Sequence, residues 1–228
     1  MVKLAKRGAA NAQIAEKLPT DPQPITEAVK TLKSFKGPKF DQTVEVCVHL
    51  GIDPRQAEQQ LRGSISMPKG VGRTARVICF CNEDLAKVAS EAGAVEAGGA
   101  ELIEKIQGGW MNFDVAVAAP DMMKLVSRLG RLLGPKGLMP SPKAGTVTPD
   151  VATAVKEYST GKLEYRNDDG GNIHCIIGKM SFPDDHLIDN LQFFLDLINK
   201  IRPAASKGHY LKKLVVSGTM TPGIQVAV

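Results

Sequence analysis

Thr43-Val-Glu-Val-Cys-Val-His-Leu50 alternates apolar residues at its even positions with polar or small residues at its odd positions. Because successive side chains of a strand point to opposite faces, this alternation predicts a strand that is buried on one face only. Strands of this kind belong to antiparallel sheets. Further strands are predicted in the last third of the chain, at 163–166, 173–177, 211–217 and 224–228.

The middle of the chain follows a different pattern. Ala75–Cys81 and Asp114–Ala118 are short, continuously apolar runs, which are typical of strands buried on both faces. Helical patterns lie between and after them, near 84–92, 100–107 and 121–133. Strands that alternate with helices predict βαβ units and a small parallel sheet.

Helices are also predicted near both ends of the chain. An apolar stripe with helical spacing indicates a helix near 25–35, and a longer one is expected over 184–201. A short helix is expected after Asp53-Pro54, with Asp53 as its N-cap.

Glycine-containing breaks separate the middle of the chain from its ends. The first break comprises Arg62-Gly63 and Met67-Pro-Lys-Gly-Val-Gly72, which precede the middle, and the second is Ser159-Thr-Gly161, which follows it. We therefore predict a mixed α/β and α+β fold, in which both termini build one split antiparallel α+β domain around an inserted three-layer α/β (Rossmann-like) domain. The expected boundaries are 1–67 with 160–228 for the split domain and 68–159 for the insert. The expected hinge residues are Pro68, Gly70, Gly72 and Gly161.

Charge is distributed unevenly along the chain. The formal net charge of +5 favours a polyanionic partner. Residues 1–40 hold eight cations and three anions, and residues 198–213 add five cations and no anion. Residues 82–114 hold seven anions and two cations. This distribution predicts one surface that faces RNA and one that faces elsewhere, although a solvated face is the commoner reason for a run of charge.

The cysteines and the hydropathy indicate a reduced, cytosolic protein. Cys47, Cys79, Cys81 and Cys175 lie in apolar, strand-like stretches, and no C-x-x-C pair occurs. No run approaches the ~18 apolar residues that a membrane span requires, and the first residues lack the apolar core of a signal peptide.

A nucleotide-binding α/β enzyme is the alternative function. Gly130-Arg-Leu-Leu-Gly134-Pro-Lys-Gly137 superficially suggests a phosphate loop. Its spacing departs from G-x-x-x-x-G-K-[ST], because Pro135 intervenes and no Ser or Thr follows Lys136. The cysteines and histidines have no zinc-site spacing and no evident nucleophile arrangement. The sequence therefore predicts no catalysis, no metal and no cofactor.

The most unusual stretch is Met122-Met-Lys-Leu-Val-Ser-Arg-Leu-Gly-Arg-Leu-Leu-Gly-Pro-Lys-Gly-Leu-Met-Pro-Ser-Pro142, followed by Gly145-Thr-Val-Thr-Pro149. It closely resembles the signature of the ribosomal protein L-one family. Further landmarks occur in family order: Phe40-Asp-Gln-Thr-Val-Glu45, Leu50-Gly-Ile-Asp-Pro-Arg55, Arg62-Gly63, Met111-Asn-Phe-Asp114, Tyr165-Arg-Asn-Asp168 and Ser206-Lys-Gly208. The resemblance extends from about residue 28 to about residue 223.

The resemblance implies a structural protein of the ribosome in the cytoplasm. It implies the split two-domain fold and binding to the large-subunit rRNA that forms the mobile stalk. It also implies a part in release of tRNA from the exit site, and repression of translation of the protein's own operon mRNA. We expect the free protein to be a monomer.

The family's RNA site corresponds to three short segments of the split domain. By resemblance, the contact residues are Lys39, Phe40, Thr43, Glu45, Arg166, Asn167, Asp168, Ser217, Thr219 and Met220. Hydroxyl groups and backbone amides suit 2′-hydroxyl and phosphate oxygens, and apolar side chains suit a sugar or base. Spacing alone leaves Phe40 equally open to a core role, and Thr219-Met220 alone would be an ordinary turn.

Lys136 and Lys143, on the rigid Pro-Gly loop of the insert, are expected to make a second contact, with more rRNA or with tRNA. Packing that closes the insert domain is the alternative for this loop. The sequence departs from the family pattern at Lys69, where histidine is usual, and at Thr221, where glycine is usual. Thr221 lies where the family's backbone is expected to approach RNA.

Overall fold

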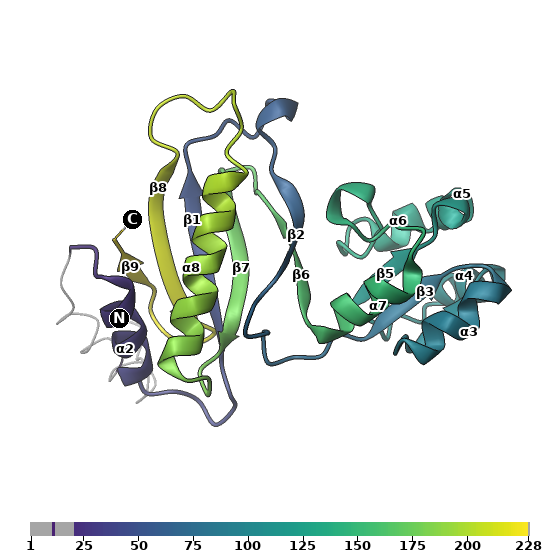
Figure 1. Ribbon diagram of the computed structural model, residues 1–228, viewed down its shortest axis with the longest axis horizontal. Coiled ribbons are helices and arrows are strands. Elements are labelled where there is room, and N and C mark those ends of the chain that lie inside the picture. Colours follow the sequence, from purple (N-terminus) through teal and green to yellow (C-terminus); the bar gives the residue numbers. More distant parts are fainter. Residues whose placement is uncertain (1–10, 12–20, 228) are drawn as a thin grey trace, which may run out of the picture. The chain divides into compact units, whose positions relative to one another are not determined.

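The computed structural model describes residue 11 and residues 21–227. Its largest sheet has four antiparallel strands: β1 (Thr43–Leu50), β7 (Asn172–Lys179), β8 (Leu211–Gly218) and β9 (Ile224–Val226). Their order is β7-β1-β8-β9, so the first of these strands lies between two that come more than 120 residues later (Figure 1). The predicted alternation on β1 is confirmed, because its even-numbered residues are buried.

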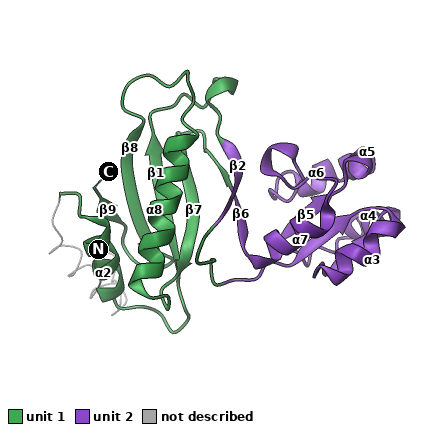
Figure 2. Ribbon diagram, viewed as in Figure 1, with its two compact units in different colours: residues 1–61, 67–72, 165–228 green, residues 62–66, 73–164 purple. Residues whose placement is uncertain are grey.

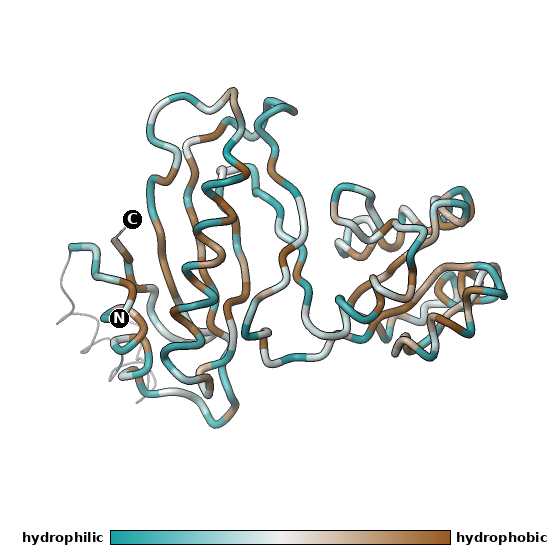
Figure 3. The backbone as a smooth tube through the Cα atoms, in the orientation of Figure 1, coloured by the Kyte–Doolittle hydropathy of each residue, from teal (hydrophilic) through white to brown (hydrophobic). Residues whose placement is uncertain are grey.

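Two helices cover one face of this sheet. α8 (Asp184–Lys200) and α2 (Ile25–Ser34) pack on it and on each other (Figure 1). Their buried side chains meet those of the strands in an apolar core, for which Val46, Leu191 and Phe194 are examples. Hydrophobic residues gather along these strands and recur along α8 (Figure 3). On the opposite face, Glu45 and His174 are exposed.

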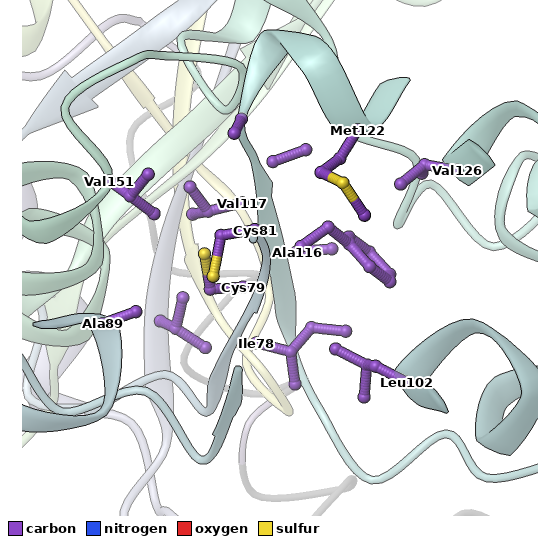
Figure 4. Close-up of a cluster of buried hydrophobic side chains, with 14 of the residues drawn as sticks. Ile78, Cys79, Cys81, Ala89, Leu102, Ala116, Val117, Met122, Val126 and Val151 are labelled. Carbon is purple, nitrogen blue, oxygen red and sulfur yellow. The ribbon is translucent and has the colours of Figure 1, made fainter. Parts of the chain in front are cut away.

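The second sheet is parallel and has the order β4-β3-β5, with β3 (Val77–Phe80), β4 (Glu96–Gly98) and β5 (Val115–Ala118). Cys79 and Val117 point toward Ala89 and Val151 of α3 (Glu83–Glu91) and α7 (Val151–Thr160), as Figure 4 shows. Ile78 and Ala116 point the other way, toward α4 (Ala100–Gln107) and the segment that follows β5 (Figure 4). The two-sided burial that the apolar runs predict is therefore confirmed, and the insert has three layers.

Several local predictions are wrong. The single helix expected over 121–133 is a series of short turns: η2 (Pro120–Met122), α5 (Met123–Val126), η3 (Ser127–Leu129) and α6 (Gly130–Leu133). Gly130, which has a poor helix propensity, begins the last of them. Asp53 is not a helix N-cap. Its carboxylate accepts a hydrogen bond from Arg55 N (3.1 Å), and the next turn, η1 (Ala57–Gln59), begins only after Gln56.

Other elements were not predicted. α7 ends at Thr160, so the expected break at 159–161 is the end of a helix, which Gly161 terminates with a φ of 116°. The expected break at Arg62-Gly63 lies in a strand, β2 (Arg62–Ser66), which pairs with β6 (Lys162–Arg166). A short turn, η4 (Pro142–Ala144), follows the Pro-Gly loop.

The chain separates into two compact units (Figure 2). Unit 1 comprises residues 1–61, 67–72 and 165–228, and unit 2 comprises residues 62–66 and 73–164. Unit 1 contains the antiparallel sheet and unit 2 the parallel one. Whether 1–67 with 160–228 and 68–159 are independent domains stays a prediction, because compact packing does not test separate folding.

Candidate nucleic-acid interface

The start of β1 is joined to the turn that follows β8. Thr219 N donates to Thr43 O (3.1 Å), and Thr43 N donates to the Thr219 hydroxyl (3.1 Å). The same hydroxyl lies 3.3 Å from Thr43 O. Two segments that are 176 residues apart in sequence are therefore held side by side in unit 1, which brings two of the three predicted contact segments together.

Two large apolar side chains flank this junction and remain in solvent. Phe40 is 55% exposed and Met220 is 50% exposed. Gln42, only 3% exposed, lies under the turn, and its Oε1 accepts a hydrogen bond from Met220 N (2.9 Å). Thr221, the residue at an unusual position, caps the same turn by accepting from Gly218 N (2.8 Å). A core role for Phe40 is therefore wrong, because burial is what such a role requires.

Strand register adds a cation that sequence inspection missed. Lys179 of β7 lies opposite Thr43 of β1, and its Nζ donates to the Thr43 hydroxyl (2.8 Å). On the other side of β1, Ser217 of β8 lies opposite Glu45. These side chains share the open face of the sheet, beside the junction. Only the pairing of β1 with β7 identifies Lys179, because no motif marks it in the sequence.

The third predicted segment forms the tight turn between β6 and β7. Asp168 accepts hydrogen bonds from Gly170 N (2.9 Å), Asn172 N (2.7 Å) and Asn172 Nδ2 (2.9 Å). The hydrogen bonds from Asn172 lower the pKa of Asp168 from its usual value. Asn167 is 8% exposed, and its Oδ1 accepts from Leu61 N (2.8 Å). Arg166 is exposed. Asn167 and Asp168 are therefore both committed to holding this turn.

The third segment does not join the other two. Asn172, which Asp168 holds, lies opposite His49 near the far end of β1, and the His49 ring bonds to the Asn172 amide (2.8 Å). Thr43 and His49 are six residues apart, or ~20 Å along a strand at ~3.3 Å per residue. The predicted contact residues therefore lie at the two ends of one open sheet face.

A cysteine and a histidine lie between these ends. His174 Nε2 is 3.9 Å from Cys47 Sγ and 3.7 Å from Asp168 Oδ2. Because the same ring nitrogen approaches both groups, the histidine cannot relay a proton from thiol to carboxylate in the manner of a catalytic triad. Burial raises the pKa of the Cys47 thiol, which disfavours the reactive thiolate. This arrangement provides a contact surface and no activated nucleophile.

The expected second contact lies in unit 2. Lys136 and Lys143 are both exposed, and Lys136 occupies the loop from Gly134 to Gly137. Gly137 has a φ of 71°, and its N–H bonds to Gly134 O (3.0 Å), so the loop is a closed turn. Exposed Arg128 and Arg131 precede it, which the sequence prediction did not include. The preceding Leu133 is fully buried, so the segment is packed at its base and cationic at its surface.

The predicted hinge glycines differ in their surroundings. The segment 67–72 belongs to unit 1, where Asn190 of α8 donates to Gly70 O (3.0 Å) and accepts from Lys69 N (3.1 Å). Gly72 stands at a change of unit and has a φ of 70°. Pro68 lies within the fastened segment, and Gly161 lies within unit 2. Their assignment as a hinge stays a prediction.

Among residue 11 and residues 21–227, no group of three or more His, Cys, Asp or Glu side chains could hold a metal ion. The four cysteines are free thiols, and burial raises the pKa of Cys175 to about 12. In this same part of the chain, no helix has the length and apolar character needed to cross a membrane.

Comparisons with known proteins place the chain in the class of structural proteins of the large ribosomal subunit. Large ribosomal subunit protein uL1 of Nocardioides sp. (strain ATCC BAA-499 / JS614) is 54% identical over 199 residues, which are 87% of this chain and 83% of that protein. The model of the ribosomal protein L1p/L10e family matches residues 32–222. The chain therefore belongs to this family.

Family membership confirms several predictions. The chain is a structural, non-enzymatic component of the ribosome, so the nucleotide-binding enzyme is wrong and the expected cytoplasmic, ribosomal location is right. The mixed fold, with one antiparallel and one parallel sheet, agrees with the family.

Proposed function

We propose that this protein binds the rRNA of the large-subunit stalk through the open sheet face of unit 1, centred on Thr43 and Thr219. The observation that carries the proposal is the junction of two distant segments, which presents Phe40 and Met220 to solvent beside hydroxyl groups and Lys179. A mixture of exposed apolar and hydroxyl groups is what shape-selective RNA contacts use.

The contact residues take different roles in this proposal. Phe40 and Met220 pack on a sugar or base, and Lys39 and Arg166 contact phosphate oxygens. Ser217 and Thr43 are available to 2′-hydroxyls, with Glu45 as an acceptor. Asn167 and Asp168 act mainly by holding the β6–β7 turn, because their hydrogen bonds are already made within the protein.

The proposal extends to the partners that the family implies. Binding to the stalk would allow the protein to take part in the release of tRNA from the exit site. In this role, the cationic side chains of Lys136 and Lys143 in unit 2 would contact RNA. The same surface would recognise a mimic of the rRNA site on the protein's own operon mRNA and so repress its translation. The free protein is proposed to be a monomer.

A salt-dependent binding titration tests the primary contact. Met220→Ala should weaken binding to a stalk rRNA fragment about tenfold, because burying the exposed Met220 side chain against RNA contributes ~1.5 kcal/mol or more. The loss of affinity should be equal at low and high salt, because an uncharged Met side chain releases no counterion from the RNA when it binds. Lys39→Ala should instead make the salt dependence shallower, by about 0.7–0.9 in slope for each lost phosphate contact. Wild-type affinity in both variants at physiological salt would contradict the proposed surface.

A further inference from the structure

A pocket opens next to the proposed interface, and none of the predicted contacts explains it. Its volume is about 300 Å³, and its lining includes Lys33, Pro38, Phe40, Gln42 and Met180. That volume is at the lower end of the ~300–1,000 Å³ typical of small-ligand pockets, so it suits one planar group. Phe40 belongs to both the pocket and the interface, which makes the two surfaces continuous.

Three polar side chains line this pocket: Lys33, Asp41 and Gln42. The Asp41 carboxylate already accepts hydrogen bonds from Ser181 N (3.2 Å) and from the Ser181 hydroxyl (2.7 Å). The third of them, Gln42, carries an amide. The residue is 3% exposed, and its Oε1 is occupied by Met220 N. Within the described part of the chain, no acceptor takes a hydrogen bond from its Nε2. A side-chain carbon at Gly37, which also lines the pocket, would come within 3.1 Å of Nε2, so the absence of a side chain there leaves the amide open. Gln42 lines the pocket, so its amide N–H favours a ligand that accepts a hydrogen bond from it.

The surroundings of the pocket select the kind of ligand. Phe40, Pro38 and Met180 provide apolar walls against which a flat ring can stack. The Lys33 ammonium is tied to Asp184 and to the Phe182 carbonyl, so the strongest cation of the pocket is already neutralised by the protein. A neutral planar ring with a carbonyl or ring-nitrogen acceptor therefore fits better than a phosphate.

From these observations we propose that the pocket takes one unstacked base of the bound RNA, stacked against Phe40 and accepting a hydrogen bond from Gln42 Nε2. The proposal rests on the proposed function, because the base is delivered by RNA already bound at the Thr43–Thr219 junction. Gln42 then links the two sites, since its two amide atoms hold the base and the Met220 turn. Sequence-specific RNA recognition commonly uses bases that are splayed out and stacked on aromatic rings.

The variants are chosen to separate the two roles of Gln42. Gln42→Glu keeps an oxygen for Met220 N and removes the donor to the base. Gly37→Ala leaves Gln42 unchanged and places a methyl group against its Nε2. Gln192→Glu is the matched control, because it makes the same chemical change at an exposed position of α8 in the same unit. Thermal unfolding midpoints within about 2 °C of wild type would show that all three variants are folded.

The experiment measures binding of the intact protein to a stalk rRNA fragment in which unpaired nucleotides are made abasic one at a time. We expect one position at which loss of the base weakens wild-type binding about tenfold, the scale of one stacked base. Gln42→Glu and Gly37→Ala should weaken binding to the unmodified RNA and lose little more with that abasic RNA, whereas Gln192→Glu should behave as wild type. Equal abasic losses in wild type and in both pocket variants, or no sensitive position, would overturn the pocket while leaving the junction intact. If the wild-type protein failed to bind any stalk RNA, that result would contradict the proposed function itself.

Discussion

At the residue scale, Thr219 combines a structural and a binding role. Its backbone N–H and its hydroxyl both bond to the Thr43 backbone, while the side chain remains exposed. The hydroxyl is therefore needed to keep the turn against β1, whatever it also offers to RNA. A serine can make the same bonds, but a valine of similar shape cannot.

We therefore expect Thr219→Val to weaken stalk-RNA binding about fivefold, the equivalent of a net hydrogen bond of ~1 kcal/mol, and Thr219→Ser to stay near wild type. Because neither change alters charge, the loss should not vary with salt. Filter binding at two salt concentrations provides the measurement. A loss in the serine variant together with wild-type binding in the valine variant would show that the methyl group, and not the hydroxyl, matters here.

Tyr210 offers a residue-scale test of stability. Its hydroxyl is buried without a hydrogen-bond partner, the only such side-chain atom within residues 21–227 and residue 11. Burial raises the pKa of Tyr210 to about 12. Tyr210→Phe removes an unsatisfied polar group, so the free energy of unfolding should stay equal or rise by up to ~1 kcal/mol. Urea unfolding measures it, and a loss of more than ~1 kcal/mol would mean that the hydroxyl has a partner in solution.

At the element scale, α8 fastens distant segments through one buried side chain. Asn190 is fully buried, and its Nδ2 donates to Gly70 O (3.0 Å) and to Ile177 O (2.7 Å), while its Oδ1 accepts from Lys69 N. The helix thereby binds both the edge of β7 and the segment 67–72. A leucine at this position would fill the space but would leave all three backbone groups unpaired.

We expect Asn190→Leu to lower the free energy of unfolding by ~3 kcal/mol or more, because each buried, unpaired backbone group costs ~1–3 kcal/mol. Urea unfolding followed by far-ultraviolet circular dichroism gives the value. Asn199→Leu, at an exposed position of the same helix, is the control. A change below ~1 kcal/mol would show that water replaces the lost contacts.

Sequence patterns predicted the elements whose hydrophobic period is regular. The alternation on β1 and the continuous apolar runs of β3 and β5 identified both sheets. α7 was missed because its polar and small residues leave a weak stripe, and β2 was missed because Gly63 suggested a break. In the candidate site, resemblance supplied Thr43 and Thr219. Identifying Gln42 and Lys179 as part of the site required the strand register and the packing of the turn, which no local sequence pattern encodes.

At the scale of the whole molecule, the proposed RNA contacts of the primary site all lie outside residues 73–164. We expect a chain in which a short Gly-Ser linker joins Gly72 to Tyr165 to retain stalk-RNA affinity within about threefold of wild type. This join keeps the segment that Asn190 fastens. Titration against the same RNA fragment measures the affinity. Tight binding by residues 73–164 alone would contradict the assignment of the site to unit 1.

The split of unit 1 also bears on the order in which the protein can form during its synthesis. β1 emerges early but pairs with β7 and β8, which are made more than 120 residues later. The strands of the parallel sheet instead pair with one another and, at Ala118, with Val147 of the same unit. Contacts between distant segments must wait for both partners, so the insert can fold while β1 is still unpaired. The junction of Thr43 with Thr219 forms only once Thr219 has been translated, 176 residues after Thr43. A chain that terminates before Thr219 therefore lacks the proposed contact surface and could not compete with the longer chain for RNA.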